Sequence, residues 1–434
     1  MGFRLPRVCL PRSDIDLSKW AVVACDQYTS EPEYWTEVAR AVGGAPSTLQ
    51  LIFPEVYLGT PEAPARIGQI QAAMRRYLAD GLLREHDGAI YVERSIDGQT
   101  RRGLMLELDL EHYDFSRTSA SLIRPTEGTI VERLAPRIEV RSGAELELPH
   151  ILVLIDDPAG TVIEPIGAER DALTRLYDTP LMQGGGRVSG HAVDAARSER
   201  AVQALQALAD PKAFAAKYRV PEGTPPMLFA MGDGNHSLAT AKAIWDRVKT
   251  SVGPDHPSRY ALVEVENIHD PALHFEPIHR VLFGVSGDLR QALADALGSR
   301  VRIVDVPSAT AMRERVRAVE AGGSQQAAGL VGPGGRFEVI EISQPPSTLA
   351  VGTLQPIIDA FIEHGGATHI DYVHGDDVLE RLGQQAGNLG MHLPTVGKSD
   401  LLRMVVREGP LPRKTFSMGE AHEKRFYVEA RRIR

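Results

Sequence analysis

The sequence predicts a mixed α/β protein (α+β, with mixed sheets) whose strands run in both orientations. Short β-prone apolar runs alternate with segments whose apolar residues recur at helical spacing, and a two-residue turn joins one pair of such runs. A chain of 434 residues is too long for one ordinary core. We therefore expect an N-terminal α/β region over residues 1–286 and a C-terminal α/β domain over residues 287–434, where a new α/β alternation begins.

Local periodicity and turn residues predict the elements of the first region. Ser30 is an expected N-cap, with Pro32 in the first turn of the helix, and Asp97 with Gly98 is a turn pair typical of β-hairpins. In chain order we predict a strand at 20–25, a helix within 26–42, a helix at 65–80, a hairpin at 89–110, two strands within 138–157, a helix at 198–208, a strand ending near 231 with a helix after it, and a strand at 259–270.

The second domain repeats the alternation. A helix, a strand at 300–306 and another helix are expected first, followed by strands at 325–332 and 336–342. The turn-rich segment "GPGGR" joins those two strands. Further helices and strands are expected from residue 354 to the end.

Charge and composition limit the partners. Forty-eight Lys and Arg against 57 Asp and Glu give a net charge of −9, which disfavours nucleic acid as a partner. No segment has the roughly 18 consecutive apolar residues of a membrane helix, and the first residues lack a signal-peptide core. The two cysteines, Cys9 and Cys25, fit a reducing cytoplasm. We expect a cytoplasmic protein with a small-molecule ligand, and a homo-oligomer is compatible with the sequence.

The segment "GDGNHS", residues 232–237, is the strongest candidate site. It lies between the strand predicted to end near residue 231 and a helix, so its backbone N–H groups start that helix and favour an anion. Gly232 and Gly234 permit a close approach to the backbone, and Asn235 and Ser237 lie at the helix start. These four residues are the predicted phosphate- or nucleotide-binding residues.

Two residues of the same segment carry reactive groups. Asp233 suits a base, a hydroxyl-orienting carboxylate or a magnesium ligand, and His236 suits a hydrogen-bond donor to a phosphoryl oxygen or a proton shuttle. They are the predicted catalytic residues. The alternative is a structural turn, in which Asp233 and Asn235 form Asx turns, Ser237 caps the helix and His236 bonds to a neighbouring loop.

Several motifs resemble one family along nearly the whole chain. "GDGNHSLATAKAIWD" resembles the segment "ADGHHRYEAAL" of the family called domain of unknown function 1015 and, more distantly, of the ParB/sulfiredoxin-like superfamily, which includes free-serine kinases. "VACDQYTSEPEYW", "RRGLMLELDLEHY", "VENIHDPALHFEPIHRVL" and "LPRKTFSM" agree in the same order. The sequence is accordingly identified as a member of this family.

The resemblance implies a ParB/sulfiredoxin-like core with an additional α/β domain. It also implies nucleotide or phosphoryl chemistry at residues 232–237, with Mg²⁺ and ATP or ADP as the expected cofactors. The chain departs from the family segment at Asn235, where the family has a histidine, and at Ser237, where it has an arginine. Loss of that arginine removes a bidentate phosphate clamp.

Other residues are candidates for the substrate pocket. Asp26, Gln27 and Tyr28 follow a predicted strand, where α/β proteins tend to bind ligands. The resemblance singles out "PIHR", which contributes His279 and Arg280. The other candidates are the cations Arg124, Arg133 and Lys414, which suit a phosphate or carboxylate but could equally well form surface ion pairs. No set of metal ligands is assigned, because the spacing of His269, His274 and His279 does not suit a zinc site.

The resulting hypothesis is a kinase-like phosphoryl-transfer enzyme or phosphohydrolase for small molecules. It would bind a nucleotide or phosphorylated metabolite at residues 232–237. Two alternatives remain open: a regulatory protein that binds a nucleotide or metabolite without catalysis, and a hydrolase that acts on a bond other than a phosphoryl bond.

Overall fold

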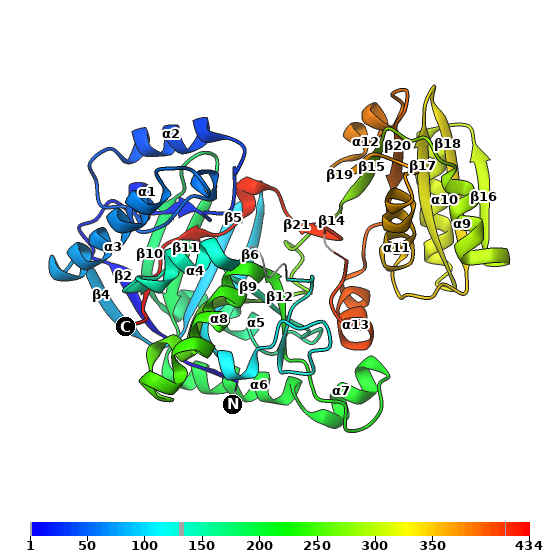
Figure 1. The fold of residues 1–434 in the computed structure, drawn as a ribbon. Helices are drawn as coiled ribbons and strands as arrows, with labels where there is room; N and C mark the ends of the chain where they lie inside the picture. The colour runs from blue at the N-terminus through cyan, green and yellow to red at the C-terminus, as the bar shows by residue number, and fades with distance from the viewer. Residues whose placement is uncertain (1, 130–133, 413) are drawn as a thin grey trace. The chain divides into compact units, whose positions relative to one another are not determined.

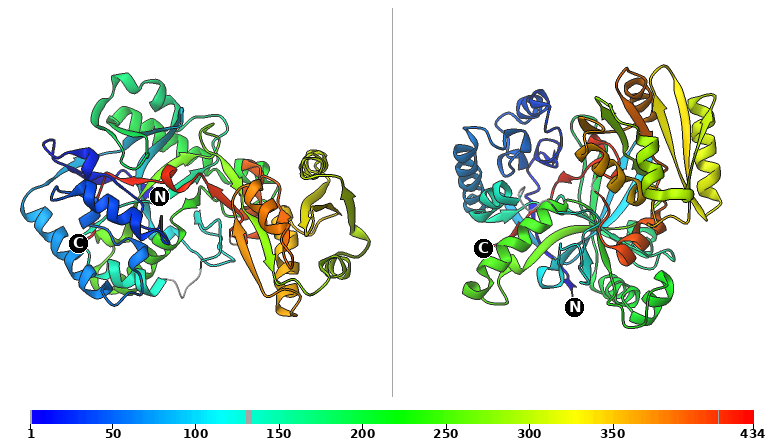
Figure 2. Two further views of the ribbon diagram at one scale, coloured as in Figure 1. Left: turned by 90° about the horizontal axis from the view of Figure 1, so that it is seen from above. Right: turned by 45° about the vertical axis from the view of Figure 1, so that its right-hand side comes forward.

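The computed structural model describes residues 2–129, 134–412 and 414–434 and divides the chain into two compact units (Figure 1). Unit 1 comprises Met1–His274 and Met418–Arg434, and unit 2 comprises Phe275–Ser417. Both ends of the chain therefore belong to unit 1 (Figure 2). The predicted division after residue 286 lies inside unit 2, because the strand His279–Phe283 pairs with two other strands of that unit.

The main sheet of unit 1 has nine strands and mixed orientation, as the sequence predicts. Its order is β10-β11-β5-β6-β13-β9-β12-β7, with β1 also paired to β6. The pairs β12/β7 and β13/β9 are parallel, and the other pairs are antiparallel. The strands of unit 1 are β1 Phe3–Arg4, β2 Arg7–Pro11, β3 Val22–Val23, β4 Leu83–Asp87, β5 Ile90–Ile96, β6 Gln99–Asp109, β7 Ile123–Arg124, β8 Leu146–Glu147, β9 Leu152–Ile155, β10 Thr174–Pro180, β11 Arg187–Ala192, β12 Phe229–Asp233, β13 Tyr260–Asn267, β22 Phe426–Tyr427 and β23 Arg431–Arg432.

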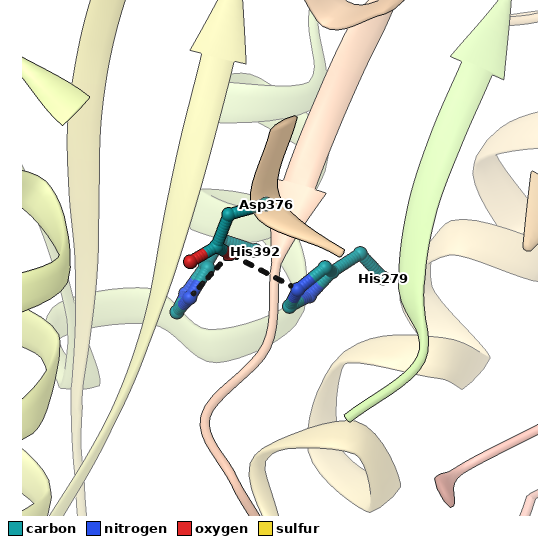
Figure 3. A group of neighbouring side chains, drawn as sticks. All are labelled: His279, Asp376 and His392. Atoms are coloured by element: carbon teal, nitrogen blue, oxygen red, sulfur yellow. Dashed lines mark ion pairs between the residues drawn. The ribbon is translucent and has the colours of Figure 1, made fainter. Parts of the chain in front are cut away.

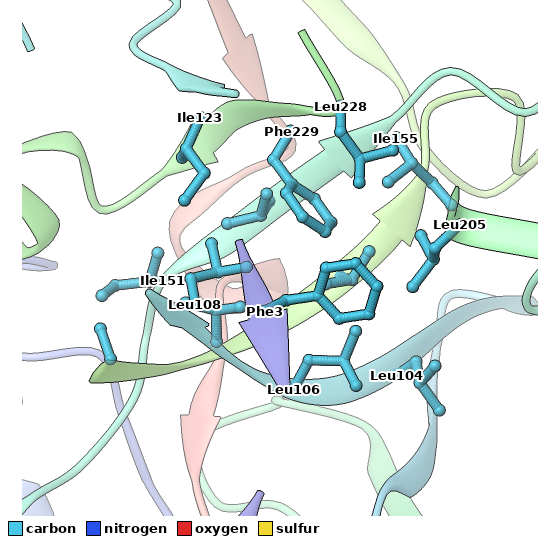
Figure 4. Close-up of a cluster of buried hydrophobic side chains, with 14 of the residues drawn as sticks. Phe3, Leu104, Leu106, Leu108, Ile123, Ile151, Ile155, Leu205, Leu228 and Phe229 are labelled. Atoms are coloured by element: carbon cyan, nitrogen blue, oxygen red, sulfur yellow. The ribbon is translucent and has the colours of Figure 1, made fainter. Parts of the chain in front are cut away.

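Both faces of this sheet are buried. Alternate residues of β6 enter different cores: Leu104 and Leu106 pack with Phe3 and Phe229 on one face (Figure 4), whereas Met105 packs on the other face with Trp35. The period of two along each strand explains this division. The helices of unit 1 are α1 Leu17–Trp20, α2 Pro32–Val42, α3 Ala63–Ala79, α4 Leu134–Ser142, α5 Glu164–Ala168, α6 Ala195–Leu208, α7 Pro211–Tyr218 and α8 Asn235–Val252.

Local predictions hold best where turn residues or long periodicity define an element. The hairpin at Asp97 and Gly98 is confirmed: both residues have positive φ, and Ile96 pairs with Gln99 across the turn. The helix at 65–80 is confirmed as α3. The predicted Ser30 cap is wrong, because α2 begins after Glu31, which makes no side-chain cap. The strand at 20–25 shortens to β3, since α1 extends to Trp20.

The C-terminal segment from Met418 forms part of unit 1. Strand β22 pairs with β3, and β23 pairs with β8. The indole N–H of Trp20 donates to the carbonyl of Val428 at 2.9 Å, and both residues are buried. Residues near the C-terminus therefore share a buried core with residues near the N-terminus.

Unit 2 contains an antiparallel sheet of six strands in the order β16-β18-β17-β20-β15-β19. Helices α10 and α12 contribute Met312, Val316 and Leu379 to a core against its strands. The elements of unit 2 are β14 Phe275–Pro277, β15 His279–Phe283, α9 Leu289–Leu297, β16 Val301–Val306, α10 Ala309–Ala321, β17 Gln325–Gly332, β18 Arg336–Ser343, α11 Ala350–Glu363, β19 His369–Val373, α12 Asp376–Gly383, β20 Leu389–His392 and α13 Lys398–Glu408, with β21 Phe416–Met418 at the boundary with unit 1.

The predicted order of elements from residue 287 to 342 is confirmed. β17 and β18 form the hairpin expected around "GPGGR", with Gly332 paired to Arg336. In the described ranges, we find no helix with the length and hydropathy that a membrane span requires.

Candidate functional site

Residues 232–237 form a strand-to-helix junction, as the sequence predicts. Strand β12 ends at Asp233, and α8 begins at Asn235 after Gly234, whose φ is 77° and ψ is 27°. A Cβ atom on Gly234 would lie 3.1 Å from the Cα atom of Ile151, so this position requires glycine for both its conformation and its packing. The junction thus holds the first turn of α8 close to the start of β9.

The start of α8 offers groups that suit an anion. The helix cap, Gly234, has no side-chain acceptor, so Ser237 does not cap the helix as the alternative interpretation requires. The N–H of Leu238 already donates to the carbonyl of Gly234, which limits the candidate anion donors to the N–H groups of Asn235, His236 and Ser237. The side-chain oxygen of Asn235 is buried and has no hydrogen-bond partner among the described residues.

Asp233 forms an ion pair with a lysine from the C-terminal segment. Its Oδ2 atom lies 3.2 Å from Nζ of Lys424, while its Oδ1 atom accepts the N–H of Gly234 at 2.9 Å. Burial opposes ionisation of Asp233, but the charge of Lys424, followed by that of His150, holds its pKa below the ordinary value. Asp233 is therefore a carboxylate at neutral pH, and 24% of its side chain remains exposed.

His150 connects Asp233 with the predicted residue Asp26. The ring of His150 would lie 3.5 Å from a Cβ atom on Gly234, and its Nε2 atom is 3.8 Å from Oδ2 of Asp26. The hydroxyl of Tyr427 lies 2.8 Å from Nδ1 of His150 and accepts the N–H of Cys25 at 3.1 Å. Donation by this hydroxyl to Nδ1 places the proton of a neutral His150 on Nε2, facing Asp26.

A second ion pair flanks Asp26. Arg137 binds Glu55 through two nitrogens, with Nε at 2.7 Å from Oε1 and Nη2 at 2.5 Å from Oε2. The N–H of Glu55 donates to the carbonyl of Cys25 at 2.8 Å, which ties this pair to the loop that carries Asp26. Burial raises the pKa of Glu55, Arg137 opposes that shift, and Asp26 reinforces it.

We refer to Asp26, His150, Asp233, Lys424 and Tyr427 as the Asp233 cluster. Its side chains are partly buried: Lys424 is 12% exposed, His150 11% and Asp26 26%. Two carboxylates, a lysine and an imidazole thus lie beside the positive end of α8. Such a set can bind an anion through the lysine and the helix start while a carboxylate accepts a proton.

The remaining candidates of unit 1 have structural contacts. Gln27 donates to Asp26 at 2.9 Å, and Tyr28 stacks on Tyr34 with ring centroids 3.7 Å apart. Arg124 is 4% exposed and donates to the carbonyls of Ser121 and Pro225. Gln27 therefore lies at the Asp233 cluster, whereas Arg124 connects the segments that contain Ser121 and Pro225. Arg133 lies outside the described residues.

Three predicted pocket residues belong to unit 2. Arg280 is fully buried and binds Gln355 together with the carbonyls of Ile278 and Lys414. Lys414 itself is exposed and has a φ of 57°. His279 lies beside Asp376 and His392 within the same unit. The contacts described for these three residues are all with other residues of unit 2.

Sequence reasoning did not identify His150, Lys424 or Tyr427. His150 precedes a short strand without a recognisable motif, and Lys424 lies in a tail whose mixed charges are typical of a solvated surface. The pairing of β22 with β3 brings Tyr427 and Lys424 to this place. The resemblance to "LPRKTFSM" ends at Met418, six residues before the lysine that pairs with Asp233.

Comparison with known proteins gives distant structural similarities. A conserved hypothetical protein from Pyrococcus furiosus is 11% identical, with a TM-score of 0.35 over 75% of this chain and 90% of that chain. A free serine kinase in complex with AMP is 11% identical, with a TM-score of 0.38 over 75% and 90%. SbnI with a C-terminal truncation, from Staphylococcus aureus, is 12% identical, with a TM-score of 0.34 over 72% and 84%.

No curated protein matches the chain. The sequence profile described as "Protein of unknown function (DUF1015)" matches residues 9–361, which include most of unit 1 and the greater part of unit 2. This match spans far more than half of the chain and includes the junction of β12 with α8. The chain therefore belongs to the DUF1015 family.

Proposed function

We propose that the protein binds a nucleotide or phosphorylated metabolite at the start of α8 and transfers or hydrolyses its phosphoryl group. The observation that supports this proposal is the Asp233 cluster, in which Asp233 and Lys424 lie 3.2 Å apart beside a glycine-capped helix start. The family resemblance of residues 232–246 points to the same chemistry. A carboxylate next to a phosphate-binding group is the arrangement that phosphoryl transfer requires.

The proposal gives each group a role. The N–H groups of Asn235, His236 and Ser237 bind phosphoryl oxygens, and Lys424 neutralises their charge. Asp233 orients or deprotonates the acceptor hydroxyl or water, because Lys424 keeps it ionised. His236 donates to a phosphoryl oxygen.

His150 and Asp26 form the opposite side of the site. Tyr427 orients the imidazole of His150 toward Asp26, so that the ring holds this second carboxylate at the edge of the site. The proposed cofactors are ATP or ADP with Mg²⁺. Oxygen atoms of Asp26 and Asp233 are the hard donors that Mg²⁺ prefers, and bound Mg²⁺ would neutralise charge on the phosphates.

Binding and turnover of the full chain test this proposal. ATP, ADP and AMP are screened for thermal stabilisation with and without Mg²⁺, and phosphate release or transfer to small hydroxy compounds is then measured. Lys424→Met should weaken nucleotide binding at least tenfold, because it removes the cation beside the phosphate. Asp233→Asn should lower turnover by about 10². His236→Ala should reduce both binding and turnover.

Matched controls lie further along α8. Asp246 and Lys242 form an ion pair at 3.0 Å on the same helix, about two to three turns beyond the junction. Asp246→Asn and Lys242→Met should leave nucleotide affinity and turnover unchanged. Melting temperature is recorded on every sample, because a purely structural junction would lose stability in the Asp233 and His236 variants and keep its activity per folded molecule.

The other possible outcomes support a different function or contradict the proposal. Tight nucleotide binding without turnover of any tested acceptor indicates a regulatory protein. Turnover of a substrate that contains no phosphoryl group, with Asp233 and His236 required, indicates a different hydrolase. Failure of every nucleotide and phosphorylated metabolite to bind contradicts the proposal.

A further inference from the structure

Three side chains of unit 2 converge at one end of its sheet. His279 is the first residue of β15, His392 is the last residue of β20, and Asp376 is the first residue of α12 (Figure 3). The antiparallel register pairs Arg280 with Met391, so His279 and His392 lie opposite each other on neighbouring strands. One ligand atom from each residue lies within 4.8 Å of the other two.

We propose that His279, Asp376 and His392 bind a divalent transition-metal ion of the zinc class. Two imidazoles and one carboxylate are donors that favour zinc and its neighbours over Mg²⁺ or Ca²⁺. This site belongs to unit 2 and is separate from the chemistry proposed for the Asp233 cluster. Its ligands come from distant parts of the sequence, so a bound ion would join β15, β20 and α12.

Two of the three distances between ligand atoms match those around a tetrahedral ion, and the third, between the two imidazole nitrogens, is within 4.8 Å. Nε2 of His279 and Nε2 of His392 lie 3.2 and 3.3 Å from Oδ1 of Asp376. Ligand atoms about 2.0 to 2.1 Å from a tetrahedral ion lie about 3.3 Å from one another. The two rings are nearly parallel, at 23° and with centroids 4.7 Å apart, so both can present Nε2 to the same side.

The shared carboxylate oxygen is enclosed by the two imidazoles. Oδ1 of Asp376 is buried, and Nε2 of His279 and Nε2 of His392 both face it. Nδ1 of His392 is buried and has no hydrogen-bond partner in the described ranges. A metal ion would accept lone pairs from this oxygen and from both Nε2 atoms at once.

Surrounding contacts orient two of the ligands. Nε of Arg313 lies 3.6 Å from Oδ2 of Asp376, and this guanidinium also binds Glu380. The arginine thereby holds one carboxylate oxygen and leaves Oδ1 for the ion. The N–H of Leu393 donates to Nδ1 of His279 at 3.1 Å, which places the proton of the neutral, ion-free ring on Nε2. Coordination through Nε2 requires the other neutral tautomer, with the proton on Nδ1, so the Leu393 hydrogen bond must break when the ion binds, and hydrogen exchange of this amide should become faster.

Metal binding by the full chain, prepared without a histidine tag and stripped with a chelator, tests the site. Zn²⁺ is titrated against a chromophoric chelator, and Co²⁺ is added separately to record its visible absorption. We expect one Zn²⁺ at this site per chain and the intense bands of a low-coordinate Co²⁺ ion. Asp376→Asn, His279→Gln and His392→Gln should each weaken Zn²⁺ binding at least tenfold and remove the Co²⁺ bands.

His364→Gln and His369→Gln are the matched controls, because both histidines belong to unit 2 and are exposed. They should bind Zn²⁺ as the wild type does. Asp376→Asn preserves the shape of the side chain, and circular dichroism of each variant verifies the fold. The wild-type Co²⁺ spectrum tests the site independently of any variant. Absence of Zn²⁺ binding by the wild type, or equal binding by folded Asp376→Asn and the controls, would overturn the proposal.

Discussion

Arg280 is a charged side chain with no exposed surface. Its guanidinium donates to Gln355 at 2.9 Å and to the carbonyls of Ile278 and Lys414, and it lies 5.1 Å from the ring of Tyr372. These contacts join β15 to the segment before β21 within unit 2. A buried cation of this kind stabilises a fold when every donor is used, and its removal leaves buried carbonyls without a partner.

We therefore expect Arg280→Met to lower the free energy of unfolding by about 3 kcal/mol. Urea unfolding followed by circular dichroism measures the change. Arg317→Met, on the exposed side of α10, is the control and should change stability by less than about 0.5 kcal/mol. A variant at Arg280 that keeps its stability and loses affinity for a phosphorylated ligand would instead support the sequence-based hypothesis of a pocket residue.

Single residues of the candidate site could be predicted where chemistry and sequence spacing coincide. Asp233 and His236 stand out because reactive groups and glycines occupy five consecutive positions. Lys424 does not, since its significance depends on an ion pair with a residue 191 positions earlier. No local pattern encodes that contact.

The junction of β12 and α8 is the element on which the proposed function depends. Gly234 combines a φ of 77° with an approach of 3.1 Å between its Cβ position and Ile151. Gly98 also has a φ of 77°, but no atom lies within 4 Å of its Cβ position. Substitutions at these two glycines therefore distinguish two contributions to the free energy of unfolding: the left-handed backbone conformation, which both share, and close packing, which only Gly234 has.

We expect Gly98→Ala to destabilise the protein by about 1 kcal/mol, which is the cost of a left-handed residue with a side chain. Gly234→Ala should cost at least about 1 kcal/mol more, because β9 must also move. The same variant should weaken phosphate-dependent stabilisation, whereas Gly98→Ala should not. Urea unfolding with and without ligand gives both quantities. If both variants lose the same free energy of unfolding, Ile151 must move away from the new methyl group without destabilising the protein.

Elements with strong local signals could be predicted, and those defined by distant pairing could not. The hairpin at Asp97 follows from its turn residues, and α3 follows from its periodicity. The sequence does not predict helix α4, because the helix overlaps residues 138–157. The sequence suggests two strands there, and the structure has β8 and β9 after the helix. The order of strands in the main sheet depends on long-range packing, which a single sequence does not record.

At the scale of the molecule, mixed α/β architecture follows from composition and alternation, but the division into units does not. The residues after Met418 return to unit 1, where β22 pairs with β3. The sequence shows no change of composition at that point, and it therefore predicts a single C-terminal domain over residues 287–434. Phe426 and Tyr427 are buried in one core with Val22 and Val23, although about 400 residues separate the two pairs in the sequence.

The charge distribution bears on binding to nucleic acid. The net charge is −9, and arginines such as Arg101, Arg259 and Arg431 form ion pairs with carboxylates of the same unit. Cations that are paired in this way contribute little attraction for a phosphate backbone.

We expect no submicromolar binding to duplex DNA or single-stranded RNA at physiological salt. Nonspecific affinity comes from cations that displace counterions from phosphates, and an acidic chain with paired arginines displaces few. Fluorescence anisotropy with a labelled 20-nucleotide probe at about 50 and 200 mM salt checks this. A protein that contacts 6 to 10 phosphates loses about 10³ to 10⁵ in affinity over that range. If the protein binds the probe tightly and its affinity falls this steeply with salt, its basic residues must form a surface that is separate from its acidic residues. An oligonucleotide would then have to be tested as the ligand of the proposed phosphate site at α8.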